Sequence, residues 1–200
     1  MKAIQIKQTG GPEVLVMAEV ATPVAGKGEA LIEIEAIGVN FIDTYFREGR
    51  YPATLPYTLG QEAAGTIVSV GPGVTDFAAG DRVAWCLVAG TYATLAVAPV
   101  ARLIRIPDAI STEQAAAAIL QGMTAHYLLH SAFPVQAGQK ILIHAGAGGT
   151  GLIVIQLAKR IGAHVITTVS TEEKAALARE AGADDVVLYT REDLVARVRS

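Results

Sequence analysis

The chain has 200 residues, of which 52% are hydrophobic and 18% are charged, and its formal net charge at pH 7 is -3. This composition is typical of a globular protein with one or two domains, and a slightly acidic chain offers no electrostatic footprint for binding nucleic acid. Because the sequence holds a single cysteine, Cys86, it excludes a disulfide framework and a multi-cysteine zinc lobe.

The sequence also predicts where the protein works. The first residues, MKAIQIKQTGG, alternate and then break at glycine, unlike a signal peptide. The longest apolar stretches are interrupted by Gly, His, Gln or Lys before they reach the length of a membrane span. We therefore expect an intracellular, cytoplasmic protein with no membrane or nucleic-acid partner.

Residues 1–107 form short strand-like runs separated by turns that are rich in Gly and Pro. Most runs alternate or are β-branched, which indicates strands. They are KAIQIKQ, EALIEIEAI, GTIVSV, DRVAWCLV, TYATLAVA and ARLIRIP. Strands of this length and spacing are typical of an irregular β-barrel or sandwich. One segment, NFIDTYFREG, is expected to be a helix with Asn40 as its N-cap.

After Pro107 the hydrophobic period changes. Ser111 and Gln114 form a capping box ahead of a helix over AAAAILQGMTAHYLL. The segments that follow are strand Lys140–His144, helix Thr150–Ile161, strand His164–Val169, helix Glu172–Ala181 with Ser170 and Glu173 as its capping residues, strand Asp185–Tyr189 and helix Glu192–Arg199. Alternation of strand and helix with short links predicts parallel βαβ units. The fold class is therefore α/β, with a β-rich domain in residues 1–123 and a partial dinucleotide-binding domain in residues 124–200.

A glycine-rich turn joins the first strand and helix of the second domain. Gly146, Gly148 and Gly151 have the G-x-G-x-x-G spacing. In a dinucleotide fold these glycines give a tight turn, room for the pyrophosphate against bare backbone, and close helix–strand packing. A phosphate loop of the other common kind needs a lysine where Leu152 stands. A merely structural turn is the alternative, and the strand–turn–helix–strand context favours dinucleotide binding.

The end of the second strand predicts which dinucleotide binds. NAD sites place Asp or Glu there, but this strand ends TTVST. Ser170 can donate a hydrogen bond to a 2′-phosphate, and Lys174 can pair with its charge. Glu172 and Glu173 are nearby, where acids stabilise the first turn of a helix. We expect NADPH.

Three segments resemble the zinc-free, zeta-crystallin-like quinone oxidoreductases of the medium-chain dehydrogenase/reductase superfamily. They are GQKILIHAGAGGTGLIVIQLAK at 138–159, GVNFIDTYFREGRYP at 38–52 and GQEAAGTIVSVGPGV at 60–74. The resemblance covers nearly the whole chain. It implies an N-terminal GroES-like domain followed by the first half of a Rossmann-type sheet. Because members of that family are longer, the chain looks truncated, either as a fragment or as a natural short form.

The resemblance also implies functional residues. Asn40, Asp43, Tyr45 and Tyr51 would lie at the substrate cleft, with Asn40 or Tyr51 bonding a carbonyl oxygen. The implied cofactor-binding residues are Thr124 near the nicotinamide, Gly146, Gly148, Gly149, Thr150 and Gly151 at the turn, and Ser170, Lys174 and Tyr189 at the adenosine end. Structural alternatives remain open: Asn40 as a helix cap, Asp43 as a buried partner, Tyr45 as a packing aromatic, and Tyr189 as a strand-end aromatic.

Zinc enzymes of this superfamily bind their metal with Cys, His and Cys. Those positions fall here at or near Asn40, Gln61 and Gln121, whose carboxamides are poor zinc ligands. His126 and His130 are one helical turn apart but have no third ligand. We predict no metal.

The predicted function is NADPH-dependent reduction of quinones by hydride transfer. A quinone accepts hydride without a Lewis acid, so positioning can supply much of the catalysis. The alternatives are an NADPH-dependent enone or alkenal reductase of the same superfamily, a non-catalytic, crystallin-like NADPH-binding protein, and an inactive fragment. The family leads us to expect a homodimer in the full-length form.

Overall fold

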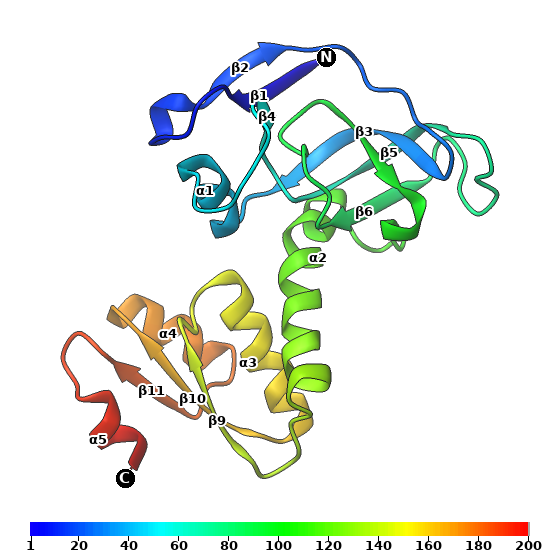
Figure 1. The fold of residues 1–200 in the computed structure, drawn as a ribbon. Helices are drawn as coiled ribbons and strands as arrows, with labels where there is room; N and C mark the ends of the chain where they lie inside the picture. Colours follow the sequence, from blue (N-terminus) through cyan, green and yellow to red (C-terminus); the bar gives the residue numbers. More distant parts are fainter. Residues whose placement is uncertain (200) are drawn as a thin grey trace. The chain divides into compact units, whose positions relative to one another are not determined.

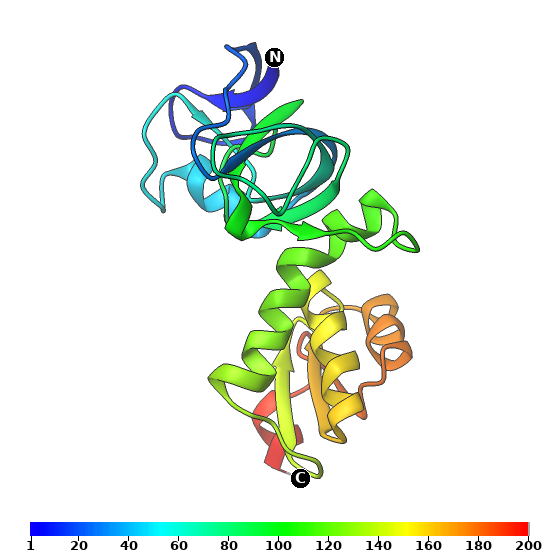
Figure 2. The same cartoon turned by 90° about the vertical axis from the view of Figure 1, so that its right-hand side faces the viewer.

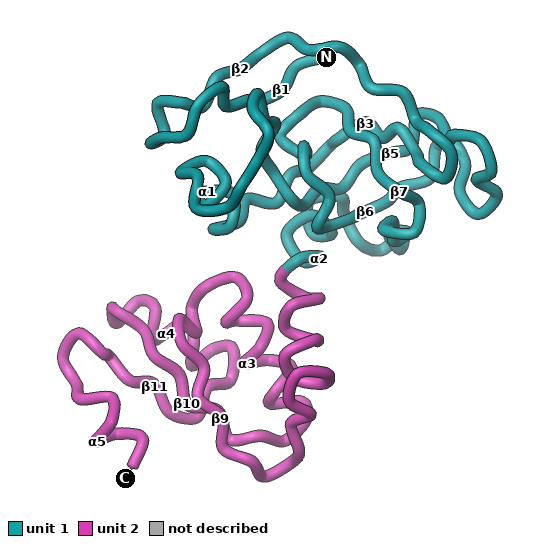
Figure 3. Tube along the Cα trace, in the orientation of Figure 1, with its two compact units in different colours: residues 1–120 teal, residues 121–200 magenta. Residues whose placement is uncertain are grey.

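The computed structural model describes residues 1–199. It divides the chain into two compact units, a first unit of residues 1–120 and a second unit from residue 121 onward (Figure 3). The division falls inside helix α2, Thr112–Tyr127. The sequence-based boundary between residues 123 and 124 lies in the same helix, so no turn or linker marks either division.

Two antiparallel sheets make up the first unit (Figure 1). One has the strand order β2-β1-β4, and the other has the order β7-β3-β5-β6-β8. The strands are β1 Lys2–Ile6, β2 Val16–Glu19, β3 Glu29–Gly38, β4 Tyr57–Thr58, β5 Glu62–Val70, β6 Arg82–Cys86, β7 Leu95–Pro99 and β8 Ile104–Arg105. Two short 3-10 helices, Pro12–Val14 and Val100–Arg102, join them.

The alternation of buried and exposed residues along β3 explains how the larger sheet packs on the core. In β3 the side chains of Ala30 and Ile32 are fully buried, whereas Glu33 and Glu35 are exposed, as expected for a strand with one face on the core. Ile32 packs with Ile67 and Trp85 from β5 and β6. The short strands β2 and β4 escaped the sequence pattern, because β2 exposes Val16 and Met17 and β4 has only two residues.

Helix α1, Phe41–Glu48, begins after Asn40 as predicted. The Asn40 backbone N–H donates to Asp43 Oδ2 at 3.0 Å, which satisfies a donor just ahead of the helix. The helix ends at Gly49, whose φ of 77° is the left-handed conformation that glycine adopts without strain.

The second unit is built on a parallel sheet in the order β11-β10-β9. Its elements are the end of α2, a π-helical turn at Leu128–Ala132, β9 Lys140–His144, α3 Gly149–Ile161, β10 His164–Val169, α4 Glu172–Glu180, β11 Asp185–Leu188 and α5 Leu194–Arg199. Helices α3 and α4 pack against the strands on the same side of the sheet (Figure 2). The order 3-2-1 is that of the first half of a dinucleotide-binding fold, so the predicted α/β class is confirmed.

The core of the second unit lies between α3 and the sheet. Ile155 and Ala158 of α3 are fully buried together with Val165 of β10. The predicted segments match these elements, with differences at their ends. Helix α5, for example, begins at Leu194 rather than at Glu192.

One predicted cap was wrong. The N-cap of α4 is Thr171, whose Oγ1 accepts from the Lys174 backbone N–H at 3.3 Å. A serine and a threonine stand side by side here, and either satisfies the capping pattern. In the structure the cap is Thr171, and Ser170 lies one residue before it.

Within residues 1–199, no helix is both long and apolar enough to cross a membrane.

Candidate functional site

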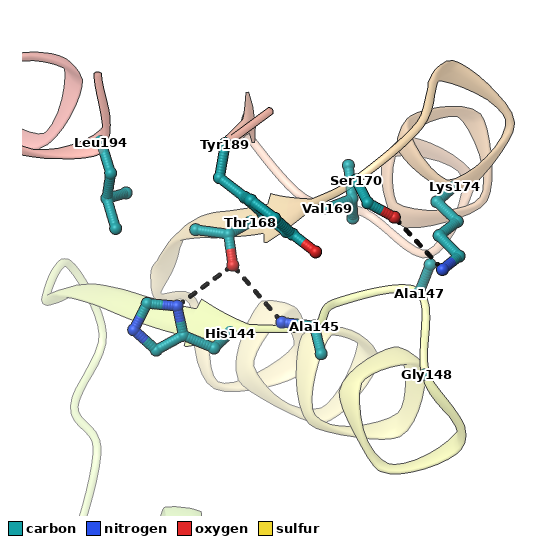
Figure 4. Close-up of a pocket in the computed structure, with 10 residues that line it drawn as sticks. All are labelled: His144, Ala145, Ala147, Gly148, Thr168, Val169, Ser170, Lys174, Tyr189 and Leu194. Atoms are coloured by element: carbon teal, nitrogen blue, oxygen red, sulfur yellow. Dashed lines mark hydrogen bonds between the residues drawn. The ribbon is translucent and has the colours of Figure 1, made fainter. Parts of the chain in front are cut away.

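A cavity of about 480 Å³ lies where β9 and β10 end in the second unit (Figure 4). The ends of adjacent parallel strands are where α/β folds bind their ligands. The residues that line the cavity are His144, Ala145, Ala147, Gly148, Thr168, Val169, Ser170, Lys174, Tyr189 and Leu194.

The start of α3 borders this cavity. Gly148 is the N-cap of the helix and has no side chain with which to cap it. The first intrahelical bond runs from Leu152 N–H to the Gly148 carbonyl at 2.9 Å. The N–H groups of Gly149, Thr150 and Gly151 therefore precede any helical carbonyl partner. Together with the helix dipole they form a site suited to an anionic group.

The glycines of the turn differ in what a side chain would meet. A Cβ on Gly146 would collide with the Thr167 side chain, and one on Gly151 would collide with the Ala145 carbonyl oxygen. These two glycines let the helix pack tightly against the strand ends. At Gly148 the nearest atom to a Cβ would be the Ala145 oxygen, at 3.2 Å. Gly148 therefore leaves its backbone open toward the cavity, as a bound pyrophosphate requires.

Ser170, Lys174 and Tyr189, which the sequence predicts for the adenosine end, line the same cavity. Lys174 Nζ donates to Ser170 Oγ at 3.3 Å, and the half-exposed Tyr189 lies on the same cavity (Figure 4). Of the neighbouring acids, Glu172 lies 3.6 Å from Arg191. That pairing reduces the repulsion that Glu172 would exert on an anion near Lys174.

The predicted cofactor residues therefore fall into three groups. Gly148, Ser170, Lys174 and Tyr189 line the cavity, while Gly146, Gly149, Thr150 and Gly151 form the turn and the first helical turn behind it. Thr124 lies on α2 and is not part of the lining. Six lining residues were not predicted from the sequence: His144, Ala145, Ala147, Thr168, Val169 and Leu194. All but Leu194 lie at or just after the ends of β9 and β10, and that position was a usable signal.

Asn40 has a buried partner in the first unit that the sequence did not reveal. Its Nδ2 donates to Glu62 Oε2 at 2.7 Å, and the Leu120 backbone N–H donates to Glu62 Oε1 at 2.6 Å. Glu62 is fully buried, so these charge-assisted bonds are what allows a carboxyl group to lie there. A glutamate directly before the apolar run of β5 was the available signal.

Asp43 is likewise buried, with 5% of its surface exposed. Its Oδ2 accepts from the Tyr92 hydroxyl at 2.8 Å as well as from the Asn40 backbone. Its Oδ1 is buried without a hydrogen-bond partner in the described structure. Burial raises the pKa of this carboxyl, and the bonds from Asn40 and Tyr92 partly oppose that shift. These contacts favour a structural role for Asp43 over substrate contact.

Tyr45 and Tyr51 belong to an aromatic group beside α1. Their ring centroids are 5.4 Å apart, and the Arg50 guanidinium lies 5.4 Å from the Tyr45 ring centre. Tyr45 also meets Phe41 edge to face. Tyr51 is 44% exposed. Tyr45 is thus engaged in packing, whereas Tyr51 keeps an accessible surface.

The donors at the positions of the superfamily's zinc ligands do not fit zinc. Asn40 is bonded to Glu62, and Gln61 Nε2 donates to the Tyr57 hydroxyl at 3.1 Å. His126 and His130 are exposed, with ring centroids 4.4 Å apart. Among the described residues, no group of three or more His, Cys, Asp or Glu side chains is arranged to hold a metal ion.

Comparison with known families and proteins follows this division of the chain. Residues 26–108 match the alcohol dehydrogenase GroES-like domain, and residues 149–200 match the zinc-binding dehydrogenase domain. A quinone oxidoreductase from Pseudomonas aeruginosa is 46% identical over 199 residues, which are 98% of this chain and 61% of that protein. A 2-haloacrylate reductase from a Burkholderia species is 43% identical, over 98% of this chain and 61% of its own length.

A solved relative has the same fold. The Escherichia coli quinone oxidoreductase, crystallised in complex with NADPH, matches with a TM-score of 0.97 and 44% identity over 100% of this chain and 62% of that one. The chain thus spans about three fifths of the length of these relatives. The resemblance seen in the sequence is confirmed.

The buried carboxyl of Asp43 predicts a pH effect on stability. Its pKa is raised in the folded state, so it stabilises the fold below its unfolded pKa of about 3.8 and loses that contribution as the pH rises through the folded value. We expect Asp43→Asn to remove this fall, because the amide oxygen still accepts hydrogen bonds but does not ionise. Urea unfolding from pH 4 to pH 7 should show wild-type stability falling relative to the variant. A constant difference across that range would contradict the assignment.

Proposed function

We propose that this chain, which belongs to the medium-chain dehydrogenase/reductase superfamily, binds NADPH in the cavity of its second unit. We also propose that it reduces quinones by hydride transfer without a metal ion. The observation that carries the proposal is the open backbone at Gly148 in the same cavity as the Ser170–Lys174 pair. The Gly148 backbone suits a pyrophosphate, and the Ser170–Lys174 pair suits a 2′-phosphate.

In this proposal the glycine turn and the Ser170–Lys174 pair have separate roles. The N–H groups at the start of α3 bind the pyrophosphate by hydrogen bonds and by the helix dipole. Lys174 supplies a positive charge and Ser170 a hydroxyl to the 2′-phosphate. The Tyr189 ring lies in the same lining and contributes apolar surface. The NADPH complex of the Escherichia coli relative supports this choice of cofactor.

When bound, NADPH supplies the hydride. The chain's part is to hold the acceptor and to stabilise charge on its oxygen. Of the two donors named from the sequence, Asn40 is bonded to Glu62, so we favour Tyr51 as the donor to a carbonyl oxygen. Tyr45 then acts through packing, because its ring orients that of Tyr51.

The acceptor class rests on the relatives together with the donor set. A quinone is electron-poor enough to take hydride without a Lewis acid, which suits the carboxamides at the positions of the zinc ligands. The quinone oxidoreductase from Pseudomonas aeruginosa supports this substrate. The 2-haloacrylate reductase supports the second candidate, reduction of an activated alkene. Both acceptor classes have a carbon–carbon double bond conjugated to a carbonyl group.

We also propose a homodimer, which rests on the family, and a cytoplasmic location, which rests on the sequence.

Turnover tests the proposed function directly. We expect the chain to oxidise NADPH in the presence of 1,4-benzoquinone, and to do so faster than it oxidises NADH. A 2-haloacrylate used as the acceptor in the same assay separates the two substrate classes. Binding of NADPH without turnover on any acceptor would contradict catalysis by this chain and favour the non-catalytic alternative.

Lys174→Ala should weaken NADPH binding about tenfold and leave NADH binding nearly unchanged, because only NADPH carries the 2′-phosphate. Fluorescence titration with each dinucleotide measures both constants. Lys140→Ala is the matched control, since Lys140 is an exposed lysine at the first residue of β9, whereas the cavity lies at the last. An equal loss for NADPH and NADH would refute the assignment of the 2′-phosphate.

Gly148→Ala should lower the affinity for NADPH and NADH alike, by about tenfold or more, because a methyl group would occupy the space left for the pyrophosphate. The nearest protein atom to that methyl, the Ala145 carbonyl oxygen, is at 3.2 Å, a tight contact that a shift of a few tenths of an ångström relieves, so we expect the variant to fold. Circular dichroism melting checks the fold, and the same titration checks binding. Retained affinity in a folded variant would make the turn merely structural.

A further inference from the structure

Thr168, near the end of β10, bonds two successive amides of the glycine turn. Its backbone carbonyl accepts from the Gly146 N–H at 3.2 Å, and its Oγ1 accepts from the Ala145 N–H at 3.4 Å. The side chain is 3% exposed. A single residue of the second strand therefore holds the beginning of the turn that follows the first strand.

The backbone conformation at the start of the turn requires such support. Ala145 has a φ of 55°, in the left-handed region that is unfavourable for a residue with a Cβ. The Ala145 carbonyl accepts from the Gly148 N–H at 2.9 Å. The orientation of Ala145 therefore sets where Gly148 lies, and with it the start of α3.

The same hydroxyl reaches a histidine. Thr168 Oγ1 lies 3.1 Å from His144 Nδ1, and both residues line the cavity (Figure 4). Because Oγ1 already accepts from Ala145, its one proton is available to donate to His144. When the hydroxyl donates in this way, Nδ1 is the acceptor and the neutral imidazole carries its proton on Nε2.

We propose that Thr168 is a positioning residue for dinucleotide binding. Its hydroxyl holds Ala145 in the left-handed conformation and fixes His144 in the Nε2–H form, as a hydrogen-bond donor to an oxygen atom of the dinucleotide. The second part of this statement rests on the proposed function. The link between the Thr168 hydroxyl and the His144 tautomer is argued from their 3.1 Å contact and does not depend on the proposed function.

The test uses variants that separate the hydroxyl from the shape of the side chain. Thr168→Val keeps the branched shape and removes the hydroxyl, and Thr168→Ser keeps the hydroxyl. Thr167→Val is the matched control, because the neighbouring Thr167 hydroxyl is also buried but donates to the Ile143 carbonyl at 2.7 Å. The first readout is the ¹⁵N chemical shifts of the His144 ring at pH 8, assigned by their loss in His144→Gln. The second is the dissociation constant for NADPH.

We expect the Nε2–H tautomer in the wild type, in Thr168→Ser and in Thr167→Val. Thr168→Val should lose this tautomer preference and bind NADPH about tenfold more weakly. An Nδ1–H tautomer in the wild type would overturn the proposal, even if Thr168→Val failed to fold. Unchanged ring shifts and affinity in a folded Thr168→Val would also overturn it. A wild type that shows the Nε2–H form but does not bind NADPH would instead refute the proposed function and leave the hydroxyl–tautomer link intact.

Discussion

The close approach of Gly151 to the Ala145 carbonyl is the contact on which the second unit depends. No side chain fits between them, so α3 begins directly against the end of β9. This packing brings the first amides of the helix to the edge of the sheet, next to the end of β10. The cavity follows from that arrangement, because the turn, the strand ends and the start of α4 then surround one space. So tight a turn places Ala145 in the left-handed conformation, which is unfavourable for alanine.

The first unit depends on a different constraint, the burial of carboxyl groups. Glu62 and Asp43 lie inside the protein and are held by donors from Asn40 at the N-cap of α1, from the middle of α2 and from Tyr92. A buried carboxyl without such donors would strongly destabilise the fold. Asn40 and Asp43, which the family resemblance implied for the substrate cleft, therefore also link the start of α1 to Glu62 and Tyr92. Tyr51 also packs edge to face on Tyr45 and Phe46, but 44% of its surface stays exposed.

Local patterns in the sequence were enough to predict most elements. The alternation of β3, the capping box at Ser111 and Gln114 and the glycine spacing are signals contained within about ten residues, and the structure confirms each of them. Contacts between distant residues were out of reach. Asn40 meets Glu62 across 22 positions, and His144 meets Thr168 across 24. The cap of α4 was misplaced by one residue because Ser170 and Thr171 are chemically alike, and only the backbone distinguishes them.

We propose that the cavity at the ends of β9 and β10 binds NADPH. Isothermal titration of the 200-residue chain with NADPH and with NADH tests this proposal, since binding does not require a substrate. We expect one site per chain and tighter binding of NADPH than of NADH. Equal affinities, or no binding by a chain that melts cooperatively, would contradict it.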